Sequence, residues 1–467
     1  MTWRGGARAA ARGHGAALVE DGELATSVAC LTEWPHALWG SFSPEYLELP
    51  AELLTASMKN HQRMFSAAGQ DGKLTNGFIG VSNMIVEDDA VVVAGYRRVL
   101  AARLADAKFF FDTDRKKRLE DFAARLDGVV YQKKLGTVGE KIARFAALAA
   151  HIAAAVKPEL AAEVVRVARL CKADLETQMV YEFPELQGVM GREYARHQGE
   201  PESVCQAIHE HYKPRFSGDT VPAGHPGAIV GLADRLDTLA GCFGVGLIPT
   251  GAADPFALRR AALGVIQTII EKDYRLGLAG LFDFALSQLA GKIDSSPEAA
   301  RAQMLDFFAA RLKNLWTGQG AAPDVVDATL AAGFDDLAAA RMRLEAMTEL
   351  KKRDFFEPLA VAFKRAANIT RGHARGPVHP ALFEADAEKE LNAAIAGIAS
   401  EVASSLEQRR YLAALEKIAG LRGAVDRLFD SVMVMADDPK VRENRLNLLA
   451  SLTALLGAIA DFSRVEA

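Results

Sequence analysis

Residues 96–111 read YRRVLAARLADAKFFF, and this stretch sets the pattern for most of the chain. Its apolar residues recur every three or four positions, which places them on one side of a helix: Val99, Leu100, Leu104, Ala107 and Phe111. The same period continues to the C-terminus and is interrupted only by breaks rich in glycine and proline. The sequence therefore predicts a mainly α-helical protein.

The first hundred residues depart from this helical period. Short strands are predicted at 28–31, 37–40 and 77–81, around a helix at 53–64, so an α/β piece with its connecting helix is expected over 23–125. Residues 1–22 are rich in arginine and glycine and are expected to be a disordered or atypical start.

The net charge of −5 excludes a globally basic nucleic-acid binder but not a local basic face. Residues 95–144 carry 13 Lys/Arg against 7 Asp/Glu, and residues 341–380 carry 9 against 4. Such charge is usually a solvated helix face. Two basic islands in an acidic chain nevertheless favour an anionic partner.

Several classes of protein are disfavoured by what the sequence lacks. The 4 cysteines are far apart and none has C-x-x-C spacing, which favours reduced thiols in a cytosol over a zinc or disulfide framework. No apolar run reaches membrane-spanning length, and the start does not read as a secretory signal. Neither a P-loop nor a dinucleotide-binding motif is present, and no convincing catalytic triad is recognisable.

More specific information comes from short motifs distributed along the chain. Their ranges are Leu31–Pro35 (LTEWP), Leu47–Pro50 (LELP), Met58–Gln62 (MKNHQ), Tyr131–Thr137 (YQKKLGT), Lys172–Leu175 (KADL), Glu182–Gly188 (EFPELQG), Gly246–Gly251 (GLIPTG) and Asp254–Arg260 (DPFALRR). In this order and spacing they resemble the beta subunits of bacterial heterotetrameric glycyl-tRNA synthetases. The resemblance extends from about Leu24 to the C-terminus.

The resemblance implies three parts beyond the start. They are the α/β piece at 23–125, a helical bundle of degenerate His-Asp (HD) type at 126–330, and a helical anticodon-binding domain of the DALR type at 331–467. The α/β piece resembles part of a module of phenylalanyl enzymes. The family also carries a further N-terminal region, so a fragment, a split gene or a misassigned start codon is expected here.

The resemblance also implies a function. The chain would be the tRNA-binding beta subunit of glycine–tRNA ligase, in a cytoplasmic assembly of two alpha and two beta chains with no membrane contact. The alpha chain would activate glycine with ATP and Mg²⁺, so no complete catalytic site and no cofactor are expected in this chain. One alternative is that the chain is a non-functional remnant of a split gene.

Candidate tRNA contacts lie mainly in the C-terminal part. Residues 361–369 (VAFKRAANI) predict a helix with Lys364, Arg365 and Asn368 on a polar face, where cations neutralise phosphates and an amide pairs with bases. The resemblance also covers 432–437 (VMVMAD), 442–446 (RENRL) and 461–463 (DFS). It adds Arg442, Asn444 and Arg445 as candidates, with helix-end capping as the competing role for the arginines.

Other candidates are less specific. Arg259 and Arg260 follow an expected helix start at Asp254-Pro255 and form either a phosphate clamp or ion pairs with nearby acids. Lys59, His61 and Gln62 form a polar cluster for tRNA, although a lone histidine is more often structural. We expect Met433 and Met435 to fill the core.

An alternative from a different functional class is a metal-dependent HD-type phosphohydrolase. His151 and Asp234 stand where its first and last ligands would be, but Ala173-Asp174 replaces the central His-Asp pair. We therefore expect a metal-free fold, with Asp234 as a structural carboxylate that caps a helix or pairs with an arginine.

Overall fold

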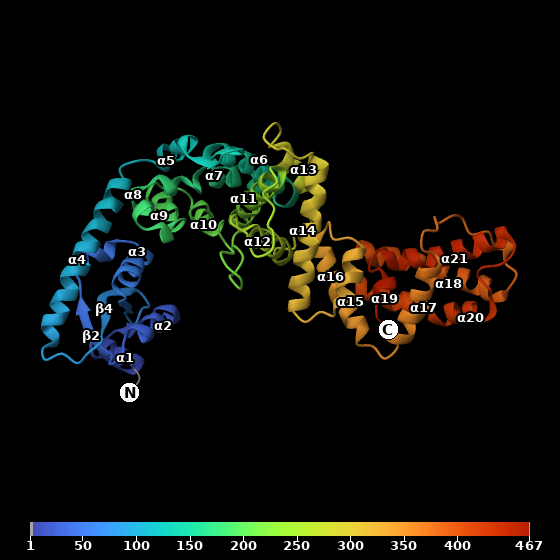
Figure 1. The fold of residues 1–467 in the computed structure, drawn as a ribbon, viewed down its shortest axis with the longest axis horizontal. Coiled ribbons are helices and arrows are strands. Elements are labelled where there is room, and N and C mark those ends of the chain that lie inside the picture. Colours follow the sequence, from blue (N-terminus) through green and yellow to red (C-terminus); the bar gives the residue numbers. More distant parts are fainter. Residues whose placement is uncertain (1–2, 467) are drawn as a thin grey trace. The chain divides into compact units, whose positions relative to one another are not determined.

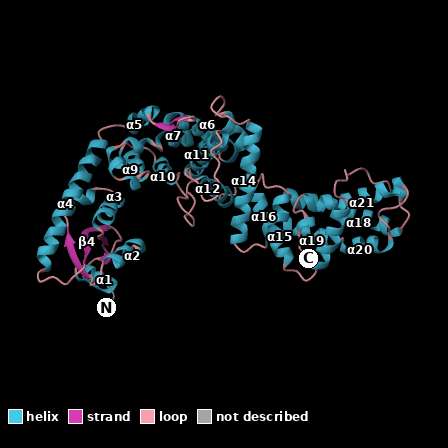
Figure 2. Ribbon diagram, in the orientation of Figure 1, coloured by secondary structure: helices cyan, strands magenta, loops and turns pink. Residues whose placement is uncertain are grey.

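The protein is described by a computed structural model, which covers residues 3–466. Helices form most of it, and the strands lie in the N-terminal part and in one small pair, β5 (Val130–Gln132) and β6 (Gly136–Thr137), as Figure 2 shows. The predicted mainly α fold with a small N-terminal α/β piece is confirmed. None of the described helices is long and apolar enough to cross a bilayer.

The chain divides into two compact units. The first unit contains residues 1–153 and 159–234, and the second contains 154–158 and 235–467. The division near residue 234 falls inside the range 126–330 that was expected to form one domain.

The N-terminal sheet is antiparallel with the strand order β1-β3-β4-β2. Its strands are β1 (Ala17–Leu18), β2 (His36–Ser41), β3 (Phe65–Ala68) and β4 (Leu74–Ser82). Two glycines let aromatic rings lie flat across the pairing of β2 with β4. A Cβ at Gly40 would lie 2.2 Å from the Phe78 ring, and a Cβ at Gly77 would lie 2.1 Å from the Trp39 ring. Both positions therefore require glycine.

The prediction of disorder over 1–22 is wrong for the described residues 3–22; residues 1–2 lie outside them. Residues 3–13 form helix α1 (Trp3–Gly13), in which Ala7 and Ala11 are fully buried. Their spacing of four places both methyl groups on the face that packs in the core beside Phe65 and Ile79. The glycines and arginines of this segment favoured a prediction of disorder, although its alanines form a short apolar stripe on one face of a helix.

A second correction concerns Val28–Leu31, which was predicted as a strand and lies in helix α2 (Gly22–Leu31). The helix begins at a strong cap, because Asp21 Oδ1 accepts a hydrogen bond of 2.8 Å from the Leu24 amide. The capped start overrides the weak strand propensity of the valine. The other two predicted strands lie within β2 and β4.

The first unit has further helices besides α1 and α2, and Figure 1 shows α4 running along the sheet. They are α3 (Ala51–Ala56), α4 (Asp89–Asp114), α5 (Leu119–Arg125), α7 (Ala161–Leu170), α8 (Gln178–Glu182), α9 (Val189–His197) and α10 (Glu202–Glu210). Two further helices, α6 (Val138–Val156) and α11 (His225–Gly244), contribute residues to both units. Four of the five residues of the stripe predicted on α4 are buried, namely Leu100, Leu104, Ala107 and Phe111, whereas Val99 is exposed.

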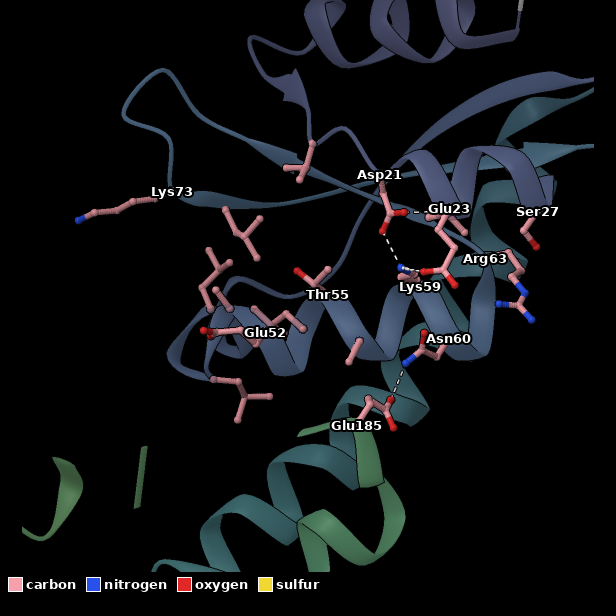
Figure 3. Close-up of a pocket in the computed structure, with 18 of the residues that line it drawn as sticks. Asp21, Glu23, Ser27, Glu52, Thr55, Lys59, Asn60, Arg63, Lys73 and Glu185 are labelled. Atoms are coloured by element: carbon pink, nitrogen blue, oxygen red, sulfur yellow. Dashed lines mark hydrogen bonds and ion pairs between the residues drawn. The ribbon is translucent and has the colours of Figure 1, made fainter. Parts of the chain in front are cut away.

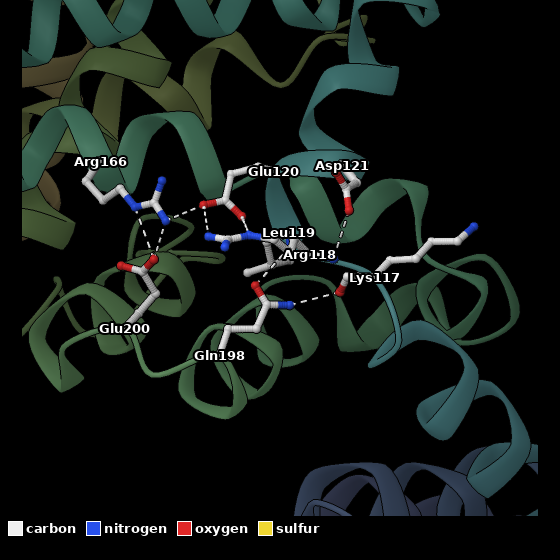
Figure 4. Close-up of polar contacts among 8 residues, drawn as sticks. All are labelled: Lys117, Arg118, Leu119, Glu120, Asp121, Arg166, Gln198 and Glu200. Atoms are coloured by element: carbon white, nitrogen blue, oxygen red, sulfur yellow. Dashed lines mark hydrogen bonds and ion pairs between the residues drawn. The ribbon is translucent and has the colours of Figure 1, made fainter.

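A polar network joins α5 to α7 and to the segment before α10. Figure 4 shows the Arg166 guanidinium between two carboxylates, with Glu120 at 2.5 Å and Glu200 also bonded. The Gln198 side chain accepts from the Leu119 amide at 3.0 Å and donates to the Lys117 carbonyl. Together these bonds fix the turn that follows α4.

The second unit is helical throughout its described part, apart from short turns and loops. Its helices are α12 (Leu258–Glu271), α13 (Leu278–Ser287), α14 (Pro297–Gly318), α15 (Pro323–Ala331), α16 (Leu337–Lys351), α17 (Phe356–Ile369), α18 (Asp386–Glu407), α19 (Tyr411–Ala419), α20 (Arg422–Ser431) and α21 (Pro439–Gly457). The predicted start of a helix at Asp254 is wrong by four residues. Asp254 still caps α12, because its two oxygens accept from the Leu258 and Arg259 amides at 2.8 and 2.9 Å.

Candidate nucleic-acid interface

The polar face predicted on α17 exists, although its three candidates differ in their surroundings. Arg365 and Asn368 are exposed, and the Arg365 guanidinium carbon lies 4.2 Å above the centre of the Phe429 ring. Asn368 accepts a hydrogen bond of 2.7 Å from Arg371. Lys364 is half-buried and its ammonium group donates to the Val465 carbonyl at 3.0 Å. Arg365 and Asn368 are therefore available to a ligand, whereas Lys364 also holds the C-terminal tail.

The expectation that Asn444 and Arg445 contact RNA is contradicted by their burial. Asn444 is 2% exposed and its amide bonds both backbone groups of His379. Arg445 is 6% exposed and lies 2.8 Å from Glu388, which is itself fully buried. A buried guanidinium between carboxylates is a structural pair. Although burial alone raises a carboxyl pKa, Arg445 keeps the pKa of Glu388 below its usual value.

These side chains on α21 brace two neighbouring loops. Asn447 binds His373 and the Gly376 amide in the loop that precedes α18. Arg445 donates to the Met433 carbonyl at 3.0 Å, and the half-buried Arg442 donates to the Ala436 carbonyl at 3.3 Å, both in the loop between α20 and α21. Arg442, expected to touch RNA or a helix end, therefore holds a loop.

Core filling by Met433 and Met435 is also contradicted. The two methionines are 76% and 58% exposed, whereas the alternating Val432 and Val434 are buried. The valines therefore anchor the loop, and the methionines face solvent. All four residues are apolar, so the sequence alone carried no signal for which of them face solvent.

Sequence reasoning also missed the cations of the loop before α18. Arg371 and Arg375 are exposed, and Arg375 has no ion pair within residues 3–466. Glycine and proline marked the segment as a loop, but which of its side chains face outward depends on Asn444 and Asn447.

In the first unit, Lys59 lines an open groove of about 1310 Å³. Figure 3 shows its ammonium group between Asp21 and Glu23, each at 2.9 Å. Hydrogen bonds to Glu23 and Asp21 raise the pKa of Lys59 above its usual value. The groove continues to Arg63, which is exposed and adopts a left-handed backbone with φ 53°.

His61 and Gln62 lie beside this groove but do not join Lys59 in one cluster. His61 ends the π-helical turn η2 (Ser57–His61). Its ring packs edge-on against the Phe183 ring, with the two ring centres 5.4 Å apart. Gln62 is half-buried at a small hollow near Met64. Of the three candidates, Lys59 alone lines the groove, and its ammonium group is already paired with Asp21 and Glu23, so the predicted polar tRNA cluster is not assembled here.

Arg259 and Arg260 lie at the start of α12. The Arg259 guanidinium donates to the Gly251 carbonyl at 2.5 Å, and Arg260 is exposed. Burial and the nearby charge of Arg259 lower the pKa of Arg311, whose guanidinium carbon lies 4.7 Å from the Phe307 ring centre. Guanidinium groups thus gather at this helix start, and the phosphate clamp stays a prediction.

Asp234 lies in a buried charged cluster. Its carboxylate is 2.7 Å from the Lys141 ammonium group and 2.8 Å from that of Lys172. Although burial raises a carboxyl pKa, these two lysines hold the pKa of Asp234 well below its usual range. Two ammonium groups lie where a divalent cation would need to approach. Asp234 is therefore a paired carboxylate as expected, but its partners are lysines and not the arginine that was predicted.

The other residues of the hypothetical metal site do not converge on Asp234. His151 is exposed, and the buried Asp174 accepts instead from the Gly188 and Gly191 amides at 2.6 and 3.0 Å. Burial raises the pKa of Asp174 to about 6. Among the described residues, no three His, Cys, Asp or Glu side chains are grouped to hold a metal ion.

Comparison with known proteins gives two family matches. Residues 3–331 match the family described as the glycyl-tRNA synthetase beta subunit, and residues 359–462 match the DALR anticodon-binding domain. The second match covers α17–α21, the helices that carry Arg365, Asn368 and the braced loops.

Individual relatives agree with the family matches. The chain is 50% identical over 455 residues to a glycine–tRNA ligase beta subunit of Trichlorobacter lovleyi, covering 97% of this chain and 66% of that protein. The corresponding protein of Geobacter metallireducens is 50% identical over 458 residues, covering 98% and 66%. That of Myxococcus xanthus is 47% identical over 470 residues, covering 98% and 67%. The chain thus spans about two thirds of the length of these curated relatives.

Proposed function

The chain belongs to the family of glycyl-tRNA synthetase beta subunits, and from this membership we propose that it binds tRNA for the ligation of glycine. The observation that carries the proposal is the match of α17–α21 to an anticodon-binding domain. It is supported by the exposed polar groups of Arg365, Asn368 and Arg371 on and after α17. Guanidinium groups neutralise phosphates and stack on bases, which suits a single-stranded RNA loop.

The partner in this proposal is a glycyl-tRNA synthetase alpha chain, in an assembly of two alpha and two beta chains in the cytoplasm. The printed names of the relatives describe beta subunits, which supports an alpha partner. ATP and Mg²⁺ would bind the alpha chain. In this proposal the contribution of this chain is to hold and orient the RNA.

Titration of tRNA into the purified chain at several salt concentrations tests the proposal. Binding of a glycine-accepting tRNA should be tighter than that of a non-cognate tRNA and should weaken steeply with salt, because each phosphate contact releases counterions. Replacing Arg365 by alanine should weaken binding and lower the salt slope by about one.

Arg427→Ala is the matched control, because this exposed arginine lies in the same domain but pairs with Glu390. If the wild-type chain and Arg365→Ala bind tRNA with equal affinity, the assignment of the polar face of α17 to tRNA binding is wrong. Equal, weak binding of both tRNAs would move selectivity to other parts of the assembly.

A further inference from the structure

Two aromatic side chains of the first unit face solvent to an unusual degree. Phe109 on α4 is 63% exposed and Tyr181 on α8 is 87% exposed. Phe109 lies on the side of α4 opposite Leu104 and Phe111, which are buried. Large aromatic rings left in water, rather than in a core, commonly mark a binding surface.

A hollow of about 420 Å³ lies beside these rings, and Phe110 and Tyr181 both line it. Phe110 connects it to the outer face, because the Phe109 and Phe110 ring centres are 5.8 Å apart. A hollow of this size admits one small planar ring system. Two aromatic walls favour a ligand with a flat π face.

The polar groups that line the hollow restrict which ring systems it can bind. Glu176, Gln178 and Glu182 line it, and the Gln178 side chain has no hydrogen-bond partner within residues 3–466. Arg103 approaches Glu182 only at 3.9 Å. Carboxylates accept hydrogen bonds from exocyclic amino groups, as they do from the amino group of cytosine. The lining therefore matches a nucleobase that carries an amino group.

Exposed cations lie on α4 and on the segment directly after it, although α4 itself carries four Lys/Arg against four Asp/Glu. Residues 95–118 contain eight Lys/Arg against three Asp/Glu. Arg97, Arg98 and Lys116 are exposed and have no ion pair among the described residues. Arg98 and Phe109 lie on one face of α4, because eleven residues complete slightly more than three turns. Exposed aromatics beside unpaired cations are the usual means of binding single-stranded nucleic acid.

We propose that the hollow between α4 and α8 binds an unpaired, amino-bearing base of RNA, stacked against Tyr181 and Phe110. Phe109, Arg98 and Lys116 then hold the adjoining nucleotides. This inference rests on the proposed function, since it adds a second RNA contact to the one on α17. The competing occupant, a helix of a partner protein, would not need the cations.

Fluorescence anisotropy with short labelled RNA homopolymers tests the inference. Oligoadenylate and oligocytidylate should bind more tightly than oligouridylate, whose base has no amino group. Tyr181→Ala and Phe109→Ala should each weaken this binding roughly tenfold, because stacking on an aromatic side chain is lost. Tyr181→Phe should retain it. Phe216→Ala is the matched control, since Phe216 in the same unit is also 63% exposed.

The outcomes separate this inference from the proposed function. If Tyr181→Ala and Phe109→Ala bind the oligonucleotides and tRNA like Phe216→Ala, the hollow is not an RNA site, while tRNA binding that depends on Arg365 still stands. If the alpha chain protects Tyr181 from chemical modification and RNA does not, the hollow is a protein interface. If the wild-type chain binds no RNA, both proposals fail.

Discussion

At the scale of single residues, the C-terminal domain separates arginines that support the fold from arginines that remain available. Arg445 and Arg365 look alike in the sequence, yet Arg445 is enclosed by Glu388 and Glu384, whereas Arg365 is exposed and lies across the half-buried Phe429 ring. Glu388 is 57 residues from Arg445 in the chain, so no local pattern predicts their pairing. The polar face at Arg365 and Asn368 was predictable because it depends only on helical spacing.

Arg445→Ala should lower the free energy of unfolding by about 3 kcal/mol, because it leaves the Glu388 carboxylate buried without its cation. Urea unfolding of the full chain, followed by circular dichroism, measures the loss. Arg427→Ala should leave stability nearly unchanged, since both partners of its ion pair with Glu390 are exposed. A loss at Arg445 no larger than that at Arg427 would contradict the buried pair.

At the scale of elements, the sequence predicted long helices better than short segments. The stripe of α4 spans many turns and gives a repeated signal, whereas α1 and α2 depend on two alanines and one aspartate cap. The start of α12 was misplaced because Asp254 reaches the Leu258 and Arg259 amides across a loop. The sequence indicated that Asp254 could cap a helix, but it did not indicate how many residues separate Asp254 from the first residue of that helix.

The contact between α5 and α7 leads to a prediction about pH. Hydrogen bonds from Arg118 and Arg166 lower the pKa of Glu120 to about 2, below its usual value of 4.5. A carboxyl group with a lowered pKa in the folded state stabilises the fold above pH 4.5 and loses that contribution as the pH falls toward 2.

The stability difference between the wild-type chain and Glu120→Gln should therefore be largest near pH 6 and shrink steadily below pH 4.5. Thermal unfolding at a series of pH values measures it. A constant difference across the series would mean that the Glu120 charge does not hold α5 to α7.

At the scale of the whole molecule, the two units carry separate candidate RNA contacts. The second unit presents Arg365 and the loop with Arg371 and Arg375, and the first unit presents the hollow beside Tyr181. A tRNA carries several unpaired segments, so contacts on both units would add to affinity. The family resemblance was evident from motif order, but the exposure that defines each contact depends on tertiary packing.

The proposed division of labour gives a prediction for the assembly. The purified chain alone should not catalyse glycine-dependent exchange of pyrophosphate into ATP, and an added alpha chain should supply that activity. Arg365→Ala should leave the exchange reaction unchanged while slowing the attachment of glycine to tRNA, because it removes an RNA contact only. Exchange activity in the purified chain, free of alpha chain, would overturn the division.

The alternation of buried Val432 and Val434 with exposed Met433 and Met435 has a chemical consequence. Mild peroxide meets the two outward thioethers before it reaches those of buried Met347 or Met304, and it converts them to polar sulfoxides. The valines keep their packing during this change. Exposed Met84 and Met342 would be oxidised as well, but they lie in other tryptic peptides, so the mass gained by the peptide that contains Met433 and Met435 reports whether a bound partner shields that loop.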